Sequence, residues 1–412
     1  MSYRMEFRAH WRPLLAATVG MSLGLALNHY VMSLFAPAII AEFGWSRAQY
    51  ALIGIAPFVT MFFIPLAGRF TDRVGPRIAA TVGFVSLPLG YLALSFMNGS
   101  FYLFLAILIV KATFGTLTTT MVFARVVVER FDRARGIGLS IVMSGAPLVA
   151  AVAVPFVAEI IADYGWRNGF RALGLLSILG GVITVILLGR GKGAAPVVSE
   201  RHVAYSRNDV VQLFRSPLFL LTIGGMLLVN VPQLLVASQL KLVLAENGAS
   251  GAAATGIIAL YAGGVAVGRF ISGLALDRIA VHKVAIFALG LPALGLAALA
   301  SPFDAVWLLG GSVLLMALAQ GAEGDIGAYL VSRKFALRNY SLILSFLTVS
   351  LTLGAATGPL ILSYTLRLAD RYDSFLLISA GATLVGAVLF YLTGKHPGER
   401  EVAPALGRPA LA

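Results

Sequence analysis

Long apolar runs dominate this chain of 412 residues. A helix needs about 20 predominantly apolar residues to cross the hydrocarbon core of a bilayer. Runs of about this length cover residues 14–36, 48–68, 78–97, 101–127, 137–160, 171–189, 218–242, 253–275, 283–301, 305–331, 341–366 and 374–394. Only 12% of the residues are charged, whereas a soluble domain carries about 25%. We therefore expect an all-α membrane protein with twelve transmembrane helices.

The basic residues predict the orientation of these helices. An even number of spans places both termini on the same side of the membrane. If that side is the cytoplasm, the inner segments hold 23 of the 31 lysines and arginines, and the outer loops hold 6. An excess of basic residues in cytoplasmic loops is typical of membrane proteins. We expect a multi-pass protein of an inner or plasma membrane with both termini in the cytoplasm.

The same placement explains the net charge of +13. The positive loops are expected to face anionic membrane lipid. Lipid is therefore the expected partner of this charge, and nucleic acid is not.

The N-terminus allows a second interpretation. Arg4, Arg8 and Arg12 precede an apolar run, as in a secretory signal peptide. That run is long enough to span a membrane, and many more spans follow it. We therefore expect a retained first helix.

A short motif occurs twice, at corresponding places in two halves of the chain. The first copy is Gly68-Arg69-Phe70-Thr71-Asp72-Arg73-Val74-Gly75-Pro76-Arg77, and the weaker second copy is Gly273-Leu274-Ala275-Leu276-Asp277-Arg278. The two Asp-Arg pairs are 205 positions apart, about half the chain. Internal repeats of this kind are common in transporters. We expect a six-helix bundle over 1–189, a cytoplasmic linker over 190–217 and a second six-helix bundle over 218–412.

The first copy resembles the signature loop between helices two and three of the major facilitator superfamily. The resemblance rests on Gly68, Asp72-Arg73, Gly75 and Arg77. It implies the major facilitator fold and a gating role for these five residues, and for Asp277 and Arg278 in the second copy. Arg125, near the end of the fourth run, is expected to pair with Asp72 as part of the gate.

Four charged residues lie well inside the apolar runs: Lys111, Arg269, Glu323 and Asp325. Charges at membrane depth are costly and usually face a bundle interior or an aqueous cavity. Lys111 either attracts an anion or relays charge, or it ties its helix to backbone carbonyls or to a polar neighbour such as Thr113. Arg269 needs an anion, which is either a substrate carboxylate or one of the two acids at similar depth. These two acids are the candidates for proton coupling, and the alternative for both is ion pairing or helix capping.

Glu323 and Asp325 are two positions apart, so on a helix they point about 200° from each other. We expect one of them to face a cavity and the other to pack inward.

Several uncharged polar residues are further candidates for substrate binding. Asn28, His29 and Tyr30 interrupt the first run, and Tyr261 lies eight residues before Arg269. Asn230, Gln233 and Gln239 interrupt the seventh run, where they either bind substrate or link helices by hydrogen bonds.

Within the superfamily, four stretches resemble the monocarboxylate porters and the bacterial oxalate/formate exchangers. These stretches are Phe43-Gly44-Trp45-Ser46-Arg47, Arg130-Phe131-Asp132-Arg133-Ala134-Arg135-Gly136, Tyr164-Gly165-Trp166-Arg167 and Gly321-Ala322-Glu323-Gly324-Asp325. Arg269 matches the arginine that binds the substrate carboxylate in that family. Val265 stands where animal members carry a proton-coupling aspartate. The resemblance implies a small organic anion as substrate, carried with protons or by exchange.

The sequence favours secondary transport over enzymatic function. It has no cysteine, no cluster of metal ligands, no nucleophile with a matching base and no phosphate-binding loop. We therefore expect no cofactor and no metal, an ion gradient or exchange as the energy source, and a monomer. The alternative transporter is a polyspecific exporter of drugs or hydrophobic cations. A membrane sensor would need a larger soluble segment than the linker and tails provide.

Overall fold

All secondary structure in the described part of the chain is helical. The computed structural model describes residues 3–131, 134–189, 207–249, 251–302, 305–335 and 340–396. Contacts divide the chain into two units: 1–199 with 235–263, and 200–234 with 264–412. The bundle boundaries predicted from the sequence stay a prediction, and most of the predicted linker, 190–206, lies outside the described residues.

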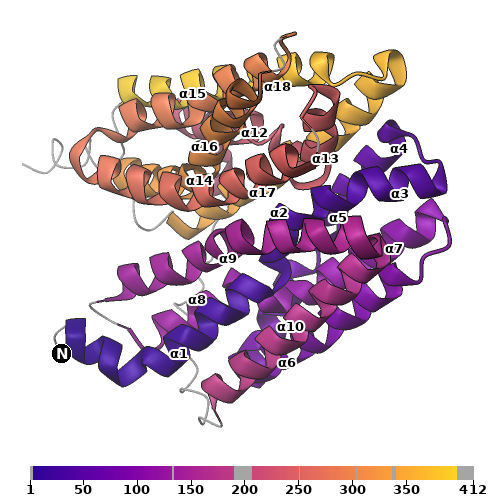
Figure 1. Cartoon of the computed structure of the whole chain (residues 1–412). Coiled ribbons are helices and arrows are strands. Elements are labelled where there is room, and N and C mark those ends of the chain that lie inside the picture. Colours follow the sequence, from indigo (N-terminus) through magenta and orange to yellow (C-terminus); the bar gives the residue numbers. More distant parts are fainter. Residues whose placement is uncertain are drawn as a thin grey trace, which may run out of the picture. The chain divides into compact units, whose positions relative to one another are not determined.

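The first unit contains both long helices and short helical pieces (Figure 1). Its α-helices are α1 (Tyr3–Leu23), α2 (Asn28–Val31), α3 (Ala36–Phe43), α4 (Arg47–Ala51), α5 (Ala56–Met61), α6 (Ile64–Ser95), α7 (Phe101–Gly115), α8 (Thr120–Val128), α9 (Arg135–Tyr164) and α10 (Trp166–Leu188). Short 3-10 helices join them: η1 (Leu25–Leu27), η2 (Met32–Phe35), η3 (Leu52–Ile55) and η4 (Thr116–Thr118). Helix α1 packs against α9 and α10, and α10 packs against α6.

The remaining helices run from 207 to 395. They are α11 (Arg207–Arg215), α12 (Pro217–Val229), α13 (Gln233–Glu246), α14 (Gly251–Arg278), α15 (Val281–Leu299), α16 (Val306–Lys334), α17 (Tyr340–Ala369), α18 (Asp373–Leu392) and the 3-10 helix η6 (Thr393–Lys395). Most of α13 and the first half of α14 belong to the first unit. In the second unit, α15 packs against α16 and α18, and α12 packs against α17 and α18.

Eleven segments of the described chain are long and apolar enough to cross a membrane. The sequence predicted twelve, and the difference lies in the second run, 48–68. That run is divided among α4, η3, α5 and the start of α6, so no single helix of spanning length covers it. Helix α6 then continues through the third run, although Gly75 has φ 81° and ψ 163° inside it. This backbone conformation favours glycine and separates the two predicted runs.

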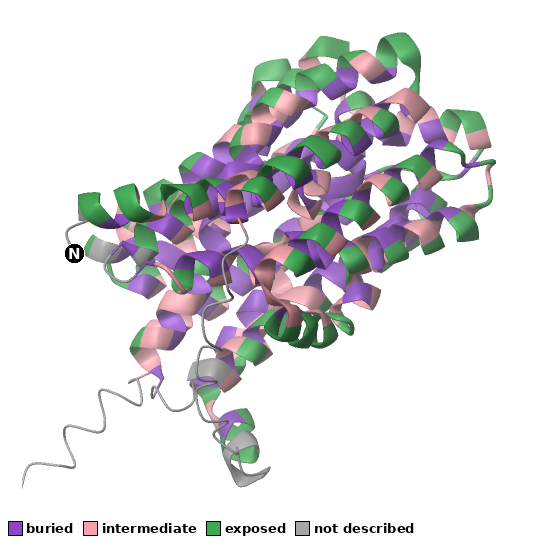
Figure 2. Cartoon of the chain, turned by 90° about the horizontal axis from the view of Figure 1, so that it is seen from below, coloured by how far each residue is buried: buried purple, intermediate pink, exposed green. Residues whose placement is uncertain are grey.

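Helix α10 carries small residues on its buried face and large apolar residues on its exposed face. Gly174, Ser177, Gly181 and Thr184 are buried. The exposed side chains on the same helix are large and apolar: Leu175, Ile178, Leu179, Val182 and Ile186. Figure 2 shows this alternation of buried and exposed bands along the helices. Small residues inside allow close helix packing, and large apolar residues outside suit a lipid environment.

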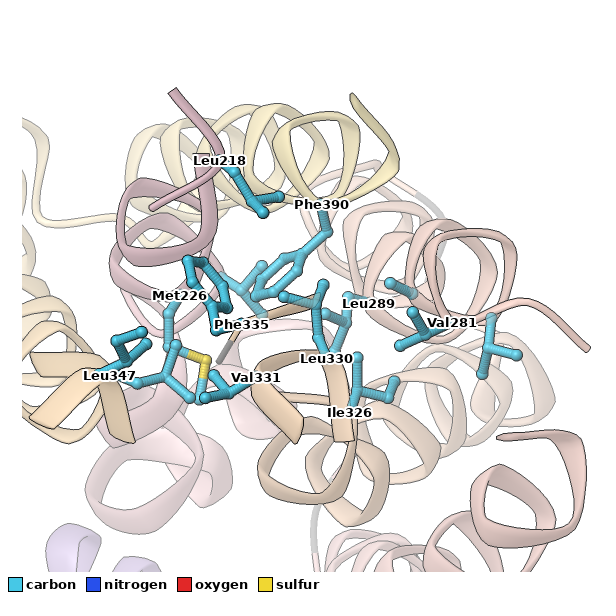
Figure 3. Close-up of a cluster of buried hydrophobic side chains, with 14 of the residues drawn as sticks. Leu218, Met226, Val281, Leu289, Ile326, Leu330, Val331, Phe335, Leu347 and Phe390 are labelled. Carbon is cyan, nitrogen blue, oxygen red and sulfur yellow. The ribbon is translucent and has the colours of Figure 1, made fainter. Parts of the chain in front are cut away.

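Each unit has its own apolar core. In the first, a Cβ at Gly20 of α1 would lie 2.2 Å from Cζ of Phe123, so the ring of Phe123 packs directly on the α1 backbone. In the second, Met226, Ile326, Leu330 and Phe390 belong to one buried cluster, which Figure 3 shows. Van der Waals packing of this kind stabilises helix association inside a membrane, where lipid is as apolar as the side chains.

Candidate functional site

Lys111 is buried near the C-terminal end of α7. Only 4% of its surface is exposed, and its Nζ donates a hydrogen bond of 2.9 Å to Oδ1 of Asn28. The ammonium also lies 4.3 Å from the ring centroid of Tyr91 on α6, a cation–π distance. Among the residues that the structure describes, no carboxylate forms an ion pair with Lys111. Its charge is therefore held by a neutral amide and an aromatic face.

Gly90 makes room for the Lys111 side chain. A Cβ at Gly90 of α6 would lie 2.5 Å from Cγ of Lys111 and 2.8 Å from its Cβ. The lysine stem therefore lies directly against the α6 backbone. Any larger residue at position 90 would displace it.

Asn28 lies where the first span is interrupted. Gly24 is non-helical, with φ −85° and ψ −157°, and the short elements η1, α2 and η2 follow it. The backbone N–H of Leu25 donates to Oγ1 of Thr118 at 2.9 Å, and Thr118 lies in η4, the interruption between α7 and α8. The two interrupted helices therefore meet at this point. Discontinuous helices at membrane depth are typical of transporter binding sites.

Three aromatic residues that the sequence singled out lie together. Nε2 of His29 is 3.3 Å from the hydroxyl of Tyr261 on α14. The rings of His29 and Tyr30 are 5.1 Å apart in an edge-on arrangement, and the ring of Tyr261 is 6.2 Å from each of them. Asn28, the residue before His29, thus binds Lys111, while His29 and Tyr30 contact Tyr261.

In the second unit, Arg269 of α14 faces Asp325 of α16. Nε of Arg269 is 4.0 Å from Oδ2 of Asp325, and the side chains are 21% and 48% exposed. This is one of the pairings that the sequence predicted for Arg269. At this distance the pair is loose, because a charge-assisted hydrogen bond between such groups is about 2.7–2.9 Å long.

Glycines set the spacing of α14 and α16 at the level of this pair. A Cβ at Gly321 would lie 2.1 Å from the carbonyl oxygen of Val265 and 2.7 Å from the backbone nitrogen of Arg269. A Cβ at Gly268 would lie 2.2 Å from the carbonyl oxygen of Leu318. The Gly-Ala-Glu-Gly-Asp stretch therefore brings two helices into backbone contact, in addition to carrying two acids.

Glu323 is buried, unlike Asp325. Only 5% of its surface is exposed, and Oε1 has no hydrogen-bond partner. The side chain of Asn230, which is fully buried just after α12, donates from Nδ2 to the carbonyl oxygen of Met226 at 2.8 Å. The sequence predicted that one acid faces a cavity and the other packs inward. Glu323 is the buried acid, and the cavity stays a prediction.

The other two polar candidates of the seventh span lie on α13. Gln233 is half-buried at the start of the helix, and Gln239 is fully buried.

The predicted gating residues have mixed surroundings. Arg125 forms an ion pair with Asp72, as the sequence predicted, and its Nε also donates to Oε1 of Glu129 at 2.5 Å. Glu129 was not singled out, although its position four residues after Arg125 on one helix was a usable signal. A Cβ at Gly68 would come no closer than 3.7 Å to Sδ of Met121, so packing alone does not require glycine there.

For the remaining gating candidates the structure gives the exposure of the side chains and no ion pair among the described residues. Arg73 is exposed, Arg77 is half-buried, and Arg278 is the exposed last residue of α14. The side chain of Asp277 lies outside the described residues.

Two of the four family-like stretches pack against each other in the first unit. Glu42, just before one stretch, accepts hydrogen bonds from Nε1 of Trp166 at 2.6 Å and from Nη1 of Arg167 at 2.8 Å. Nη2 of Arg167 also donates to the carbonyl oxygen of Met97 at 3.1 Å. In this structure these stretches hold the ends of helices together.

Comparison with known proteins decides the family. A model described as Major Facilitator Superfamily matches residues 17–242 and 225–411. The chain belongs to this superfamily. It is therefore a transporter and not an enzyme, and the predicted major facilitator fold is confirmed.

Two curated relatives of this superfamily member are distant. The chromaffin granule amine transporter of Rattus norvegicus is 25% identical over 169 residues, which make up 40% of this chain and 31% of that protein. Monocarboxylate transporter 7 of Homo sapiens is 24% identical over 203 residues, 44% of this chain and 38% of that protein. The matched parts thus span only about a third of these relatives.

Solved structures resemble the chain over nearly its whole length. A bacterial homolog of the human lysosomal transporter Spinster, in an inward-facing and unoccupied conformation, has a TM-score of 0.65 and 18% identity. The alignment covers 96% of this chain and 98% of that one. A mutant of the nucleoside transporter NupG has a TM-score of 0.73 and 13% identity, with 92% and 99% covered. At these identities the likeness concerns the fold alone.

Proposed function

We propose that this secondary transporter moves a small organic anion of the monocarboxylate type by alternating access. The observation that carries the proposal is the burial of Lys111 beside Asn28 and Tyr91, with no carboxylate paired to it among the described residues. A buried charge without a counter-ion is unfavourable. A substrate carboxylate would supply the missing negative charge, so Lys111 would favour anions over neutral or cationic solutes.

Arg269 is the second proposed contact for the substrate carboxylate. Its loose pairing with Asp325 leaves guanidinium donors for another anion. A bound substrate carboxylate would replace Asp325 as the partner of Arg269. Substrate binding would then be coupled to movement between α14 and α16. The resemblance to monocarboxylate porters supports the same assignment.

The polar residues near Lys111 would orient the rest of the substrate. We propose this role for Asn28, His29, Tyr30 and Tyr261 on the basis of their mutual contacts. Asn230 and Gln233, at the interruption between α12 and α13, are proposed as further contacts.

The predicted topology and gate belong to the same proposal. The distribution of lysine and arginine supports cytoplasmic termini in an inner or plasma membrane, with 190–217 as a cytoplasmic linker. Asp72 and Arg125, joined by their ion pair, are the proposed centre of the gate. The transporter would work as a monomer, driven by protons or by exchange.

A cationic substrate is the second candidate. The similarity to the amine transporter and the half-exposed Asp325 support it. A cation exporter would need a net negative site, whereas the four membrane charges of this chain balance.

Thermal stability of the detergent-purified protein separates the two candidates. Formate, acetate, L-lactate, pyruvate, oxalate and benzoate are tested as anions, and tetraphenylphosphonium as a cation. A ligand present at about 100 times its Kd stabilises the folded state by about 2.7 kcal/mol. We expect stabilisation by at least one carboxylate and none by the cation.

Two variants test whether stabilisation by the carboxylate depends on Lys111. Lys111→Gln should abolish stabilisation by the carboxylate, because the amide is uncharged. Lys283→Gln, which removes an exposed lysine at the start of α15, is the control and should keep it. Stabilisation by tetraphenylphosphonium alone, unchanged in Lys111→Gln, would replace the anion proposal with the cation one.

A further inference from the structure

A groove in the second unit lies between the start of α12 and the end of α18. It has a volume of about 390 Å³, and its apolar lining is exposed or half-buried: Pro217, Leu220, Leu221, Leu389 and Leu392. Lys395, the last residue of η6, and His396 directly after it complete the lining. This α12–α18 groove therefore combines an apolar wall with a basic end.

The groove begins where the close packing of α12 and α18 ends. A Cβ at Gly225 would lie 3.1 Å from the carbonyl oxygen of Gly386, so the two backbones are close together at that level. One residue nearer the start of α12, a Cβ at Gly224 would lie 3.5 Å from Cδ1 of Leu389, an ordinary contact. Beyond these glycines, leucines on both helices line the groove. Side chains of this size keep two helices further apart than glycines do.

The inner faces of the same helix segments are covered by protein. Leu218 of α12 and Phe390 of α18 belong to the buried cluster that Figure 3 shows. Leu220, only two residues after Leu218, is 46% exposed. Both helices belong to segments that are long and apolar enough to cross a membrane. The groove is therefore expected to open toward lipid.

The end of α18 is held by neighbouring helices, so the position of Lys395 is well defined. Nζ of Lys334, in the last turn of α16, donates a hydrogen bond of 3.2 Å to the carbonyl oxygen of His396. The ring of His282 lies directly against Gly394, because a Cβ there would come within 2.5 Å of Cγ of His282. Lys395 lies between these two contacts along the chain, and its side chain is exposed.

Lys395 has no carboxylate partner among the described residues. The described acidic side chains of the second unit are Glu323, Asp325, Asp370 and Asp373. Asp373 opens α18, whose 20 residues are about 30 Å long, and Lys395 follows the other end. Arg215, two residues before Pro217, is exposed as well. Positive charge therefore gathers at this end of the groove.

The grooves of the first unit differ in this respect. One of about 480 Å³ lies between α6 and α7, and one of about 540 Å³ lies between α6 and α10. In the described structure neither lining includes a charged residue. A third groove, of about 300 Å³ among α14, α15 and α16, includes a single basic residue, Lys283. An apolar groove alone suits the acyl chain of any lipid, whereas a basic end also distinguishes between headgroups.

We propose that the α12–α18 groove binds an anionic phospholipid, with an acyl chain against the leucines and the phosphate at the ammonium of Lys395. Lysine binds phosphate as a point charge, and basic pockets between transmembrane helices bind acidic lipid headgroups. A zwitterionic headgroup carries a cation of its own, which Lys395 and Arg215 would repel. The predicted orientation places this end of the helices in the cytoplasmic leaflet, which has a negative surface potential. The inference goes beyond the proposed function and does not depend on the substrate.

The first experiment measures lipid binding to the delipidated, detergent-purified protein by native mass spectrometry. The probes are phosphatidylglycerol, phosphatidylethanolamine and phosphatidylcholine with the same acyl chains. We expect one phosphatidylglycerol to bind at least ten-fold more tightly than either zwitterionic lipid. Equal binding of the three lipids would reduce the groove to an unselective contact with the bilayer and overturn the proposal.

Two lysine variants test the headgroup contact. Lys395→Gln should lower the affinity for phosphatidylglycerol about five-fold, the contribution of one basic residue near an anionic lipid surface. Its affinity for phosphatidylcholine should not change. Lys283→Gln, at the lysine of the third groove, is the matched control and should bind as the wild type does. Wild-type affinity for phosphatidylglycerol in Lys395→Gln would reject the site.

Two leucine variants test the acyl-chain contact. Leu220→Trp fills the groove and keeps Lys395, so it should also weaken binding of phosphatidylglycerol. Leu294→Trp, at an exposed leucine of α15, is the control and should not. Glycerol 3-phosphate, which has the phosphate and no chain, should fail to compete even in large excess. Competition by glycerol 3-phosphate, or full binding in Leu220→Trp, would contradict a lipid site.

A cross-linking experiment on the wild type locates the lipid even if a variant does not fold. Phosphatidylglycerol with a photoreactive diazirine in one acyl chain is bound, irradiated and mapped by peptide mass spectrometry. We expect cross-links within 217–221 and 389–392 that excess phosphatidylglycerol removes and phosphatidylcholine does not. The chain after His396, which carries Glu399 and Glu401, is the other possible occupant of the groove. Absence of cross-links at both helix ends would assign the groove to that segment and overturn the proposal.

Discussion

At the scale of single residues, the molecule separates its membrane charges into two environments. Lys111 is buried against neutral and aromatic partners, whereas Arg269 keeps a loose carboxylate neighbour. A buried cation without a counter-ion is unfavourable until an anion approaches it, and a loosely paired cation can change partners. The two cations therefore contribute in different ways to the proposed carboxylate site.

Replacing Arg269 tests the second of these contributions. Arg269→Ala should reduce carboxylate uptake by at least ten-fold, because it removes the forked donor that we propose for the substrate carboxylate. Arg269→Lys should restore it only partly, because lysine is a point charge. Uptake by reconstituted protein is the measurement.

The fold should tolerate this change. The pair with Asp325 is partly exposed and long, so it contributes about 1 kcal/mol or less to stability. Arg371→Ala, at an exposed arginine paired with Asp373, is the control and should transport normally. Uptake by Arg269→Ala at the wild-type rate would remove Arg269 from the site.

At the scale of helices, interruptions carry several of the residues proposed to bind substrate. Asn28 is the first residue of α2, directly after η1, Asn230 lies between α12 and α13, and Thr118 lies in η4. Gly75 separates the second predicted run from the third. At Asn28 and Thr118 the polar side chains also hydrogen-bond with other elements.

The ion pair between Asp72 and Arg125 links α6 to α8. Asp72→Asn should lower the turnover rate about five-fold, which corresponds to about 1 kcal/mol for a partly exposed pair. The apparent affinity should stay within two-fold, because neither residue contacts Lys111, Asn28 or Tyr261. Initial rates of uptake over a range of substrate concentrations separate the two quantities.

A matched change sharpens this test. Glu129→Gln removes the second acid of Arg125 and should have a smaller effect in the same direction. A loss of affinity with normal turnover in Asp72→Asn would contradict the gating role.

The interruptions also mark the limit of what the sequence could predict. Run length and hydropathy predicted the all-α membrane fold, because a lipid environment demands both. They could not predict the 3-10 pieces within 25–35, since these have the same composition as α-helix. The pairing of Arg125 with Asp72 was predictable from one motif, whereas the contact between Lys111 and Asn28 joins residues 83 positions apart. Tyr91 was missed because an aromatic residue in an apolar run gives no signal of its own.

At the scale of the whole molecule, the sequence and the comparisons both indicate a membrane transporter. Superfamily membership establishes a transporter, and the charges within the membrane suggest what it carries. Lys111 and Arg269 provide positive charge, and Asp325 lies opposite Arg269.

Exchange of labelled carboxylates tests the central claim most directly. Purified protein is reconstituted into vesicles loaded with formate, L-lactate, oxalate or benzoate, and entry of the same labelled anion is measured. We predict saturable entry of at least one of these anions, lost in Lys111→Gln and kept in Lys283→Gln. Entry of none of them, in vesicles that exchange tetraphenylphosphonium or an amine, would contradict the account.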